Sequence, residues 1–494
     1  MIRGQASARG RDVMDRFSQP YDIFVIGSGP GGQRAAIQAA KMGKRVGLAE
    51  QMGVLGGVCI NTGTIPSKTL REAILQVAGP RTLAVGGATS QHGRDVTMAD
   101  LRRRVNQVIE NEIEVSRQQL RRNGIELHWA RASFVGPHTL QLEPGDGGPP
   151  RTVEANRIVI ATGTSTTMDA SIPFDGRMVL TSDDLLGITD IPRTLVVVGA
   201  GVIGLEYASM FATLGVRVTV IDKRRELLPF IDSEIVDALA YQLRRNRVTL
   251  RLGEEVSGIE KFTAEHGERV RIQLSSGKQV ISEAALYSVG RTGSTRGLRL
   301  EAAGLAADDR GRIAVDEHHQ TSTPGIYAVG DVIGFPALAS TSMEQGRLAA
   351  AHAFGVQAPA LPAVLPYGLY TVPEISMVGK TEEQLTEEGV PYEVGTAQYR
   401  EIARGQIVGD LNGMLKLIFH LETRELLGVH VIGEGATELV HIGQAVMAFG
   451  GRADYFVDTV FNYPTLAECY KTAAFDAINR MSELNIPHRD ERAA

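Results

Sequence analysis

The sequence predicts an α/β protein, because one unit of strand, glycine-rich loop and helix occurs twice along the chain. The apolar strand Ile23 to Ile26 leads into the loop GSGPGG at Gly27, and Leu195 to Val198 leads into GAGVIG at Gly199. After Pro366 the pattern changes to alternating strands followed by a helix. We therefore expect two Rossmann-like dinucleotide-binding domains and a separate C-terminal α+β domain.

Length and composition limit the class of protein. The 494 residues correspond to roughly three domains of about 150 residues. Hydrophobic residues at 43% and charged residues at 22% are ordinary globular usage, which excludes a disordered or fibrous chain. The net charge of -6 lacks the basic excess of a nucleic-acid-binding protein. No apolar stretch is long enough to cross a bilayer, so we expect neither nucleic acid nor a membrane as a partner.

The cysteine count and the N-terminal segment bear on the cellular location of the protein. Cys59 and Cys469 are too few for the disulfide framework of a small secreted protein and favour a reducing, cytoplasmic location. Residues 1–19 contain four Arg and little apolar periodicity, which predicts a disordered tail. An Arg-rich presequence is the alternative interpretation, and Met14 is an alternative start.

Each glycine of a GxGxxG loop has a physical role in a dinucleotide-binding domain. The first makes the tight turn, the second lets the backbone approach a pyrophosphate, and the third lets the helix pack closely. The helix N-terminus then attracts the phosphate charge. The helices are predicted over Gln33 to Met42 and Leu205 to Leu214. The glycines concerned are Gly27, Gly29 and Gly32 in the first loop and Gly199, Gly201 and Gly204 in the second.

An acidic residue ends the next predicted strand in each repeat. Glu50 follows Gly27 by 23 residues (50 minus 27), and Asp222 follows Gly199 by the same interval (222 minus 199). A carboxylate at this place accepts hydrogen bonds from the hydroxyls of an adenosine ribose. One glycine loop alone is weak evidence, but two loops with strand, helix and acid in register predict two dinucleotide sites.

Further strands are expected where apolar runs end in glycine turns. These are Arg157 to Ile160, which leads into Ala161, Thr162 and Gly163, and the run from Gly325 to Asp331. Each run alone is typical of a buried strand with a surface loop. In the C-terminal domain we predict strands over Met414 to Phe419 and Leu426 to Ile432 and a helix over Ala436 to Phe449.

The segment GGVCINTGTIPSK, Gly56 to Lys68, resembles the flavoprotein disulfide reductase family of lipoamide dehydrogenase, glutathione reductase and mercuric reductase. The resemblance covers nearly everything after Tyr21. In that family the segment carries two redox cysteines. Here Cys59 stands at the first position and Thr64 at the second, so no disulfide can form within the motif.

A second departure from the family lies in FNYPTLAE, where Tyr463 stands at the position of the family's acid/base histidine. A phenol with a pKa near 10 is poorly matched to proton transfer to and from thiols at neutral pH. With these two departures, the chain resembles the branch of soluble, flavin-dependent pyridine nucleotide transhydrogenases. This resemblance implies noncovalent FAD, with NAD and NADP as substrates that exchange a hydride through the flavin.

The resemblance also implies roles for individual residues. Lys68 would lie beside flavin N5, pair with Glu206 and stabilise the reduced flavin by its charge. Cys59 is interpreted as packed against the flavin, with a reactive thiol as the alternative. The FAD site would consist of Gly27, Gly29, Gly32, Glu50, Gly57, Cys59, Lys68, Thr162, Gly163, Arg291, Asp331, Leu338 and Ala339. The NAD(P) site would consist of Gly199, Gly201, Gly204, Glu206, Asp222 and Gly290.

Lys223 and Arg224 follow Asp222 directly. An acid that accepts bonds from a 2′-hydroxyl, next to bases that bind a 2′-phosphate, suits a site that accepts both NAD and NADP. The alternative is a solvated basic run on the surface.

By resemblance, residues 20–167 and 291–365 form the FAD-binding domain, 168–290 the NAD(P)-binding domain and 366–494 a dimerisation domain. A homodimer would bring Tyr463 to Glu468 to the partner's flavin, with higher oligomers left open. No metal is expected, because the histidines lack zinc-site spacing.

Three alternatives share the flavin chemistry: an NAD(P)H diaphorase or quinone reductase, a dihydrolipoamide dehydrogenase-like protein without the redox disulfide, and a flavin-binding redox sensor.

Overall fold

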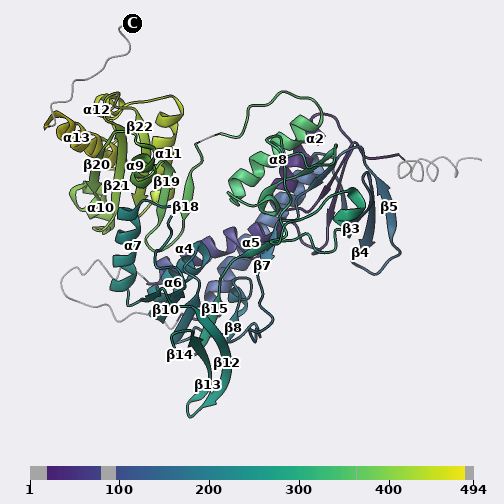
Figure 1. Cartoon of the computed structure of the whole chain (residues 1–494), viewed down its shortest axis with the longest axis horizontal. Helices are drawn as coiled ribbons and strands as arrows, with labels where there is room; N and C mark the ends of the chain where they lie inside the picture. The colour runs from purple at the N-terminus through teal and green to yellow at the C-terminus, as the bar shows by residue number, and fades with distance from the viewer. Residues whose placement is uncertain (1–18, 79–95, 363, 484–494) are drawn as a thin grey trace, which may run out of the picture. The chain divides into compact units, whose positions relative to one another are not determined.

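The computed structural model describes residues 19–78, 96–362 and 364–483, which fold as two compact units (Figure 1). Within these residues, the first unit comprises 19–69, 102–167 and 290–362. The second comprises 70–78, 96–101, 168–289 and 364–483, so it includes both the segment predicted to bind NAD(P) and the C-terminal segment. The predicted disordered tail lies outside the described residues except for Gln19.

The first unit is built on a seven-stranded sheet in the order β17-β6-β1-β2-β3-β4-β5. Strands β17, β6, β1, β2 and β3 are parallel, and β4 and β5 extend the sheet as antiparallel strands. All four residues of β1 are buried because both faces of the sheet are covered. The bounds are β1 Ile23–Ile26, β2 Val46–Glu50, β3 Glu126–Gly136, β4 Thr139–Pro144, β5 Arg151–Glu154, β6 Ile158–Ile160 and β17 Ile326–Ala328.

Two helices of the first unit, α2 (Pro30–Lys41) and α8 (Ala339–Ala353), pack side by side (Figure 1). A Cβ added to Gly346 would lie 2.0 Å from the carbonyl oxygen of Gly31, so glycine is required at this crossing. The unit also contains a small antiparallel pair, β7 (Thr164–Thr166) with β16 (Arg291–Gly293). Helix α3 is Gly57–Asn61, and the helices α4 (Thr64–Ala78) and α5 (Met98–Arg122) contribute to both units.

The second unit contains a five-stranded parallel sheet in the order β11-β10-β9-β15-β8. A three-stranded antiparallel sheet, β12-β13-β14, packs its apolar residues against it, with Ile259, Val270 and Ile272 in one core with Val196 and Ile221. The bounds are β8 Val179–Leu180, β9 Thr194–Val198, β10 Arg217–Asp222, β11 Thr249–Leu252, β12 Val256–Ala264, β13 Gly267–Leu274, β14 Gln279–Ser282, β15 Ala284–Tyr287, α6 Val202–Thr213 and α7 Ser233–Arg245.

The C-terminal part of the second unit is a five-stranded antiparallel sheet in the order β18-β19-β22-β21-β20. Helix α13 packs directly on β20, since a Cβ on Gly395 would lie 1.9 Å from the carbonyl oxygen of Ala473. The bounds are β18 Tyr367–Leu369, β19 Ile375–Gly379, β20 Tyr392–Gln398, β21 Met414–His420, β22 Leu426–Ile432, α9 Glu382–Glu388, α10 Ala403–Val408, α11 Ala436–Ala448, α12 Ala453–Asp458 and α13 Glu468–Glu483.

The predicted α/β architecture is confirmed, with one correction to the helix starts. The predicted C-terminal strands match β21 and β22, and the predicted helix matches α11. However, α2 and α6 begin three residues before the predicted starts at Gln33 and Leu205, because the last glycines of the two loops already lie in the first helical turn.

Across the described ranges, no helix has both the length and the apolar character needed to span a membrane.

A partly buried polar cluster lies where the first strands of the first unit begin. The Tyr21 hydroxyl donates a hydrogen bond to Glu126 (2.6 Å) and lies 3.0 Å from His128 Nε2. The Arg45 guanidinium lies over the Tyr21 ring, 4.3 Å from its centroid, and pairs with Glu126 at 3.3 Å. Burial, helped by the nearby Arg151, lowers the pKa of His128 to about 4.

Stability should therefore decrease in mild acid. Unfolded His128 binds a proton below its ordinary pKa of about 6.5, whereas folded His128 stays neutral down to about pH 4. Because the unfolded state binds more protons in this window, lowering the pH from 6.5 towards 4 should cost up to about 3 kcal/mol of unfolding free energy. Urea unfolding across this range measures the loss.

The variant His128→Gln should lose that part of the pH dependence. The exposed His318→Gln is the matched control and should retain it. Equal pH dependence in wild type and His128→Gln would contradict the assignment of the effect to His128.

Candidate functional site

The two glycine loops have the same construction in the two units. Gly27 and Gly199 both have φ of +104°, a conformation that favours glycine. A Cβ on Gly27 would lie 2.4 Å from the carbonyl oxygen of Ala161, and a Cβ on Gly199 would lie 2.5 Å from that of Ser288. In each unit the turn therefore passes directly over the end of a neighbouring strand.

The third glycines are required by the turn itself. A Cβ on Gly32 would lie 2.0 Å from the Gly27 carbonyl oxygen, and a Cβ on Gly204 would lie 2.0 Å from the Gly199 carbonyl oxygen. Only a hydrogen atom fits there. The first turn of each helix is thereby held against the end of the strand that precedes it.

The middle glycines, Gly29 and Gly201, are different. Their φ values of -65° and -79° suit any residue, and no described atom lies within 4 Å of an added Cβ. Both residues are helix N-caps at which no described side chain accepts the N–H groups of the first turn. A free helix N-terminus with open space beside a glycine fits a bound phosphate group, so both loops fit a dinucleotide.

The strand-end acids take equivalent places in the two units. Glu50 accepts the Ser28 N–H at 3.1 Å, the Ser28 hydroxyl at 2.6 Å and the Met52 N–H at 2.8 Å. Asp222 accepts the Ala200 N–H at 2.7 Å and the Arg224 N–H at 2.8 Å. Each carboxylate is thus fixed by backbone amides beside its loop. The sequence reasoning missed Ser28, a variable position of the loop pattern.

Asp222 is also paired with a positively charged side chain. Arg224 donates to Asp222 through Nε at 3.0 Å and Nη2 at 2.7 Å. Burial raises the pKa of Asp222, but the hydrogen bonds from Arg224 and Ala200 outweigh it and hold the pKa below its ordinary value. Lys223 is exposed. Of the two residues predicted to bind a phosphate, Arg224 is therefore already paired with Asp222, the acid predicted to bind the ribose.

Other residues predicted for the FAD site lie together in the first unit. Arg291 donates to the Thr164 hydroxyl and carbonyl, both at 2.8 Å, and the Thr164 hydroxyl lies 3.4 Å from Asp331. Burial raises the pKa of Asp331. The buried Thr162 hydroxyl has no hydrogen-bond partner among the described residues, as expected of a group that binds a cofactor.

Gly57 brings the cysteine-containing segment to the first loop. A Cβ on Gly57 would lie 3.2 Å from Gly29 Cα, and Cys59 follows in the same short helix, α3. Burial raises the pKa of Cys59, although a hydrogen bond with the Thr64 side chain opposes the increase. The thiol is therefore held protonated at neutral pH.

The remaining predicted residues stay predictions. Lys68, in α4, lies in the first unit with Nζ 3.3 Å from the Ser67 hydroxyl, whereas the buried Glu206 lies in the second. Gly290 falls in the first unit, where its carbonyl accepts the Thr167 N–H. The N-cap of α8 is Leu338, directly before Ala339, and no described side chain caps it.

Tyr463 lies in an exposed apolar part of the C-terminal segment. Tyr463 is 75% exposed. Phe449 and Val460 are more exposed still, at 91% and 90%. This is consistent with the predicted dimer contact.

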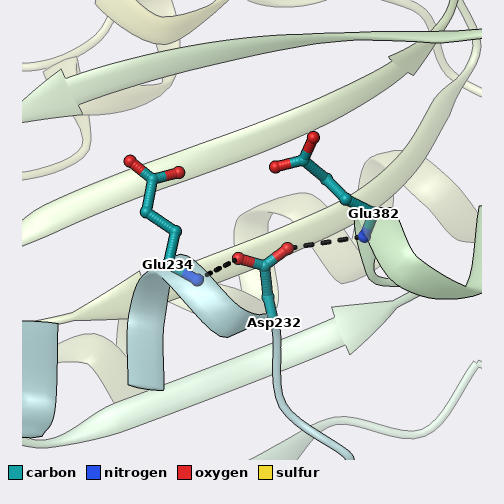
Figure 2. Close-up of side chains that lie close together, drawn as sticks. All are labelled: Asp232, Glu234 and Glu382. Carbon is teal, nitrogen blue, oxygen red and sulfur yellow. Dashed lines mark hydrogen bonds between the residues drawn. The ribbon is translucent and has the colours of Figure 1, made fainter. Parts of the chain in front are cut away.

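Among the described residues, one group of three acids is compact enough to hold a metal ion: Asp232, Glu234 and Glu382 (Figure 2). Asp232 accepts the N–H groups of the other two. The fully buried Lys416 Nζ lies 2.8 Å from Asp232 and 3.0 Å from Glu234, and it also bonds to Glu382. A lysine ammonium thus supplies the positive charge that a metal would bring.

Comparisons with known proteins match nearly the whole chain. The family model described as pyridine nucleotide-disulphide oxidoreductase matches residues 21–346, and the model of that family's dimerisation domain matches residues 365–474. A soluble pyridine nucleotide transhydrogenase of Mycobacterium tuberculosis is 52% identical over 465 residues, which cover 94% of this chain and 98% of that protein. One from Marinomonas sp. is 43% identical and covers 93% and 99%.

Solved structures agree with this relationship. The HOCl-induced flavoprotein disulfide reductase RclA from Escherichia coli has a TM-score of 0.82 at 28% identity, covering 92% of this chain and 99% of that one. LpdA from Mycobacterium tuberculosis has a TM-score of 0.83 at 26% identity, with the same coverage.

The raised pKa of Cys59 predicts a slowly reacting thiol. In a Cys469→Ser background, alkylation of Cys59 by iodoacetamide should be slow at pH 7 and should accelerate only in alkaline solution, because the thiolate is the nucleophile. Removing the hydrogen bond with Thr64→Val should move this acceleration to still higher pH. Labelling at pH 7 as fast as that of a free cysteine would contradict the prediction.

Proposed function

Because the chain belongs to the pyridine nucleotide-disulphide oxidoreductase family, whose members use FAD and NAD(P)H, we propose that it is a soluble NAD(P)⁺ transhydrogenase of the Si-specific class. The observation that carries the proposal is that both dinucleotide loops are complete while Thr64 replaces the second redox cysteine. The chain retains what hydride transfer requires and lacks what disulfide reduction requires. The names of the 52% and 43% identical relatives support the same activity.

Noncovalent FAD would supply the redox chemistry by accepting a hydride from NADPH and returning it to NAD⁺ in a ping-pong exchange, or the reverse. The chain's own residues bind and orient the reactants. The N-terminus of α2 and Glu50 would hold the ADP part of FAD, and the N-terminus of α6 and Asp222 would hold the nicotinamide nucleotide. Lys68 would place a positive charge beside the flavin, a role that needs no proton transfer.

The proposal includes a homodimer in the cytoplasm. The match to the dimerisation domain over residues 365–474 and the exposed Phe449, Val460 and Tyr463 support a second copy of the chain as the partner. The two unpaired cysteines suit a reducing compartment.

A nucleotide-exchange assay tests the function. Purified protein mixed with NADPH and thio-NAD⁺ should transfer hydride between them, and Cys59→Ser should retain most of this activity because no disulfide takes part. Reduction of quinones or dyes without exchange would support the diaphorase alternative. Loss of exchange in Cys59→Ser, or a thiolate-to-flavin absorption band on reduction, would contradict the absence of thiol chemistry.

Lys68→Met should slow flavin reduction by NADPH about 100-fold, because one charge opposite the developing negative charge is lost. FAD should remain bound through the first glycine loop and Glu50. Rapid mixing measures the rate, and the flavin absorbance measures retention. The exposed Lys41→Met, in α2, is the matched control and should reduce at the wild-type rate. A wild-type rate in Lys68→Met would remove Lys68 from the flavin site.

Arg224→Ala should weaken NADPH binding about tenfold or more and spare NADH, because hydrogen bonds to charged groups contribute roughly 1.5 to 3 kcal/mol. The variant loses a phosphate donor and also exposes the uncompensated charge of Asp222. Lys223→Ala should add to the loss. The exposed Arg225→Ala, from the same run, is the control. Titrating flavin reduction with each nucleotide measures the effect, and equal losses for both nucleotides would assign discrimination elsewhere.

A further inference from the structure

A loop of the C-terminal segment holds the carboxylate of Glu206. Glu206 lies in α6 and is 3% exposed. Its Oε1 accepts the backbone N–H of Tyr370 at 2.9 Å. Tyr370 begins the connection between β18 and β19, residues 370–374, which we call the β18–β19 loop. The orientation of this carboxylate therefore depends on a backbone amide that lies 164 residues further along the chain.

The β18–β19 loop is also anchored to α6 one turn beyond Glu206. The Val372 N–H donates to the Ser209 hydroxyl at 3.0 Å, and that hydroxyl donates to the Glu206 carbonyl at 2.8 Å. Ser209 and Thr371 are fully buried. Because the loop has no regular secondary structure, its position depends on such side-chain anchors.

Arg71 anchors the loop from the opposite side. Its Nε donates to the Thr371 carbonyl at 3.0 Å, and its Nη2 lies 3.2 Å from Glu374 Oε1. Arg71 is 2% exposed and Glu374 is 7% exposed. Glu374 is itself fixed at the start of α11, where its Oε2 accepts the Thr437 hydroxyl at 2.7 Å. The planar guanidinium thus bonds to both the middle and the end of the loop, a geometry that a lysine cannot reproduce.

Arg71 also belongs to the helix that carries Lys68. It follows Lys68 by three residues in α4, which is about one helical turn. A single side chain therefore connects this helix to the loop whose amide holds Glu206.

We propose that Arg71 is a positioning residue for hydride transfer, which acts by fixing the β18–β19 loop so that the Tyr370 N–H holds the Glu206 carboxylate. The inference rests on the proposed function only in assigning Glu206 to the hydride-transfer site. A displaced loop would leave the nucleotide bound but the reacting groups less well aligned.

Rapid-mixing measurement of flavin reduction by NADPH tests the inference. Arg71→Lys keeps the charge but not the two-point contact, so the limiting rate should fall between about 10-fold and about 100-fold, with the nucleotide concentration for half-maximal rate nearly unchanged. Arg45→Lys alters another arginine–glutamate pair, Arg45 with Glu126 in the first unit, and is the matched control. It should reduce at the wild-type rate even where its thermal stability is lower.

A double-mutant cycle separates positioning from a structural effect. If Arg71 acts through Glu206, adding Arg71→Lys to Glu206→Ala should slow reduction by less than about twofold. A wild-type rate in Arg71→Lys would overturn the inference, as would the full loss in the Glu206→Ala background. If Arg71→Lys does not fold, Glu374→Gln, which weakens the same contact, replaces it in the cycle with the same expectations.

The outcome can be distinguished from failure of the proposed function. The cycle measures only flavin reduction, whereas the proposed function requires transfer from NADPH to thio-NAD⁺. Wild-type protein that reduces its flavin but exchanges no hydride would contradict the transhydrogenase proposal and leave the test of Arg71 intact.

Discussion

The close contact between the first and third glycines of each loop is the constraint on which both candidate nucleotide sites depend. An added Cβ on Gly32 or Gly204 would lie 2.0 Å from the carbonyl oxygen of the first glycine, so a side chain would separate the helix from the strand. With glycine there, the helix starts at the strand end with no side-chain cap, and the loop amides reach Glu50 and Asp222. One backbone turn thus brings the strand-end acid and the uncapped helix N-terminus together.

The two loops differ in how the acid is compensated. Glu50 is fixed by the backbone amides of Ser28 and Met52 and by the Ser28 hydroxyl. Asp222 shares its charge with the Arg224 guanidinium, whose side chain is 46% exposed. The Asp222 side chain is only 6% exposed, so the guanidinium is the member of the pair that solvent reaches. In the proposed function, this suits a permanently bound nucleotide in the first unit and two exchanging nucleotides in the second.

Short motifs and single helices or strands could be predicted from the sequence, whereas side-chain contacts between residues far apart in the chain could not. The glycine loops, the acids and β21, β22 and α11 follow from short patterns, and the structure contains them. The contacts of Arg71 with Thr371, and of Lys416 with Asp232, join residues 300 and 184 positions apart. From the sequence pattern alone, Arg71 and Lys416 would be predicted to be solvent-exposed. Only the fold brings each of them to a buried partner.

Thr64 changes the chemistry that the redox motif can perform. Its side chain hydrogen-bonds to Cys59, so a polar contact remains where the family has a covalent bond. A hydroxyl cannot be oxidised to a disulfide, and burial keeps the remaining thiol protonated, so Cys59 can neither accept electrons with a partner nor act as a thiolate. By the resemblance, Tyr463 stands where the family has its acid/base histidine, and a phenol is poorly matched to proton transfer with thiols at neutral pH. In the proposed function, both thiol steps are absent and hydride exchange between the flavin and a nicotinamide remains.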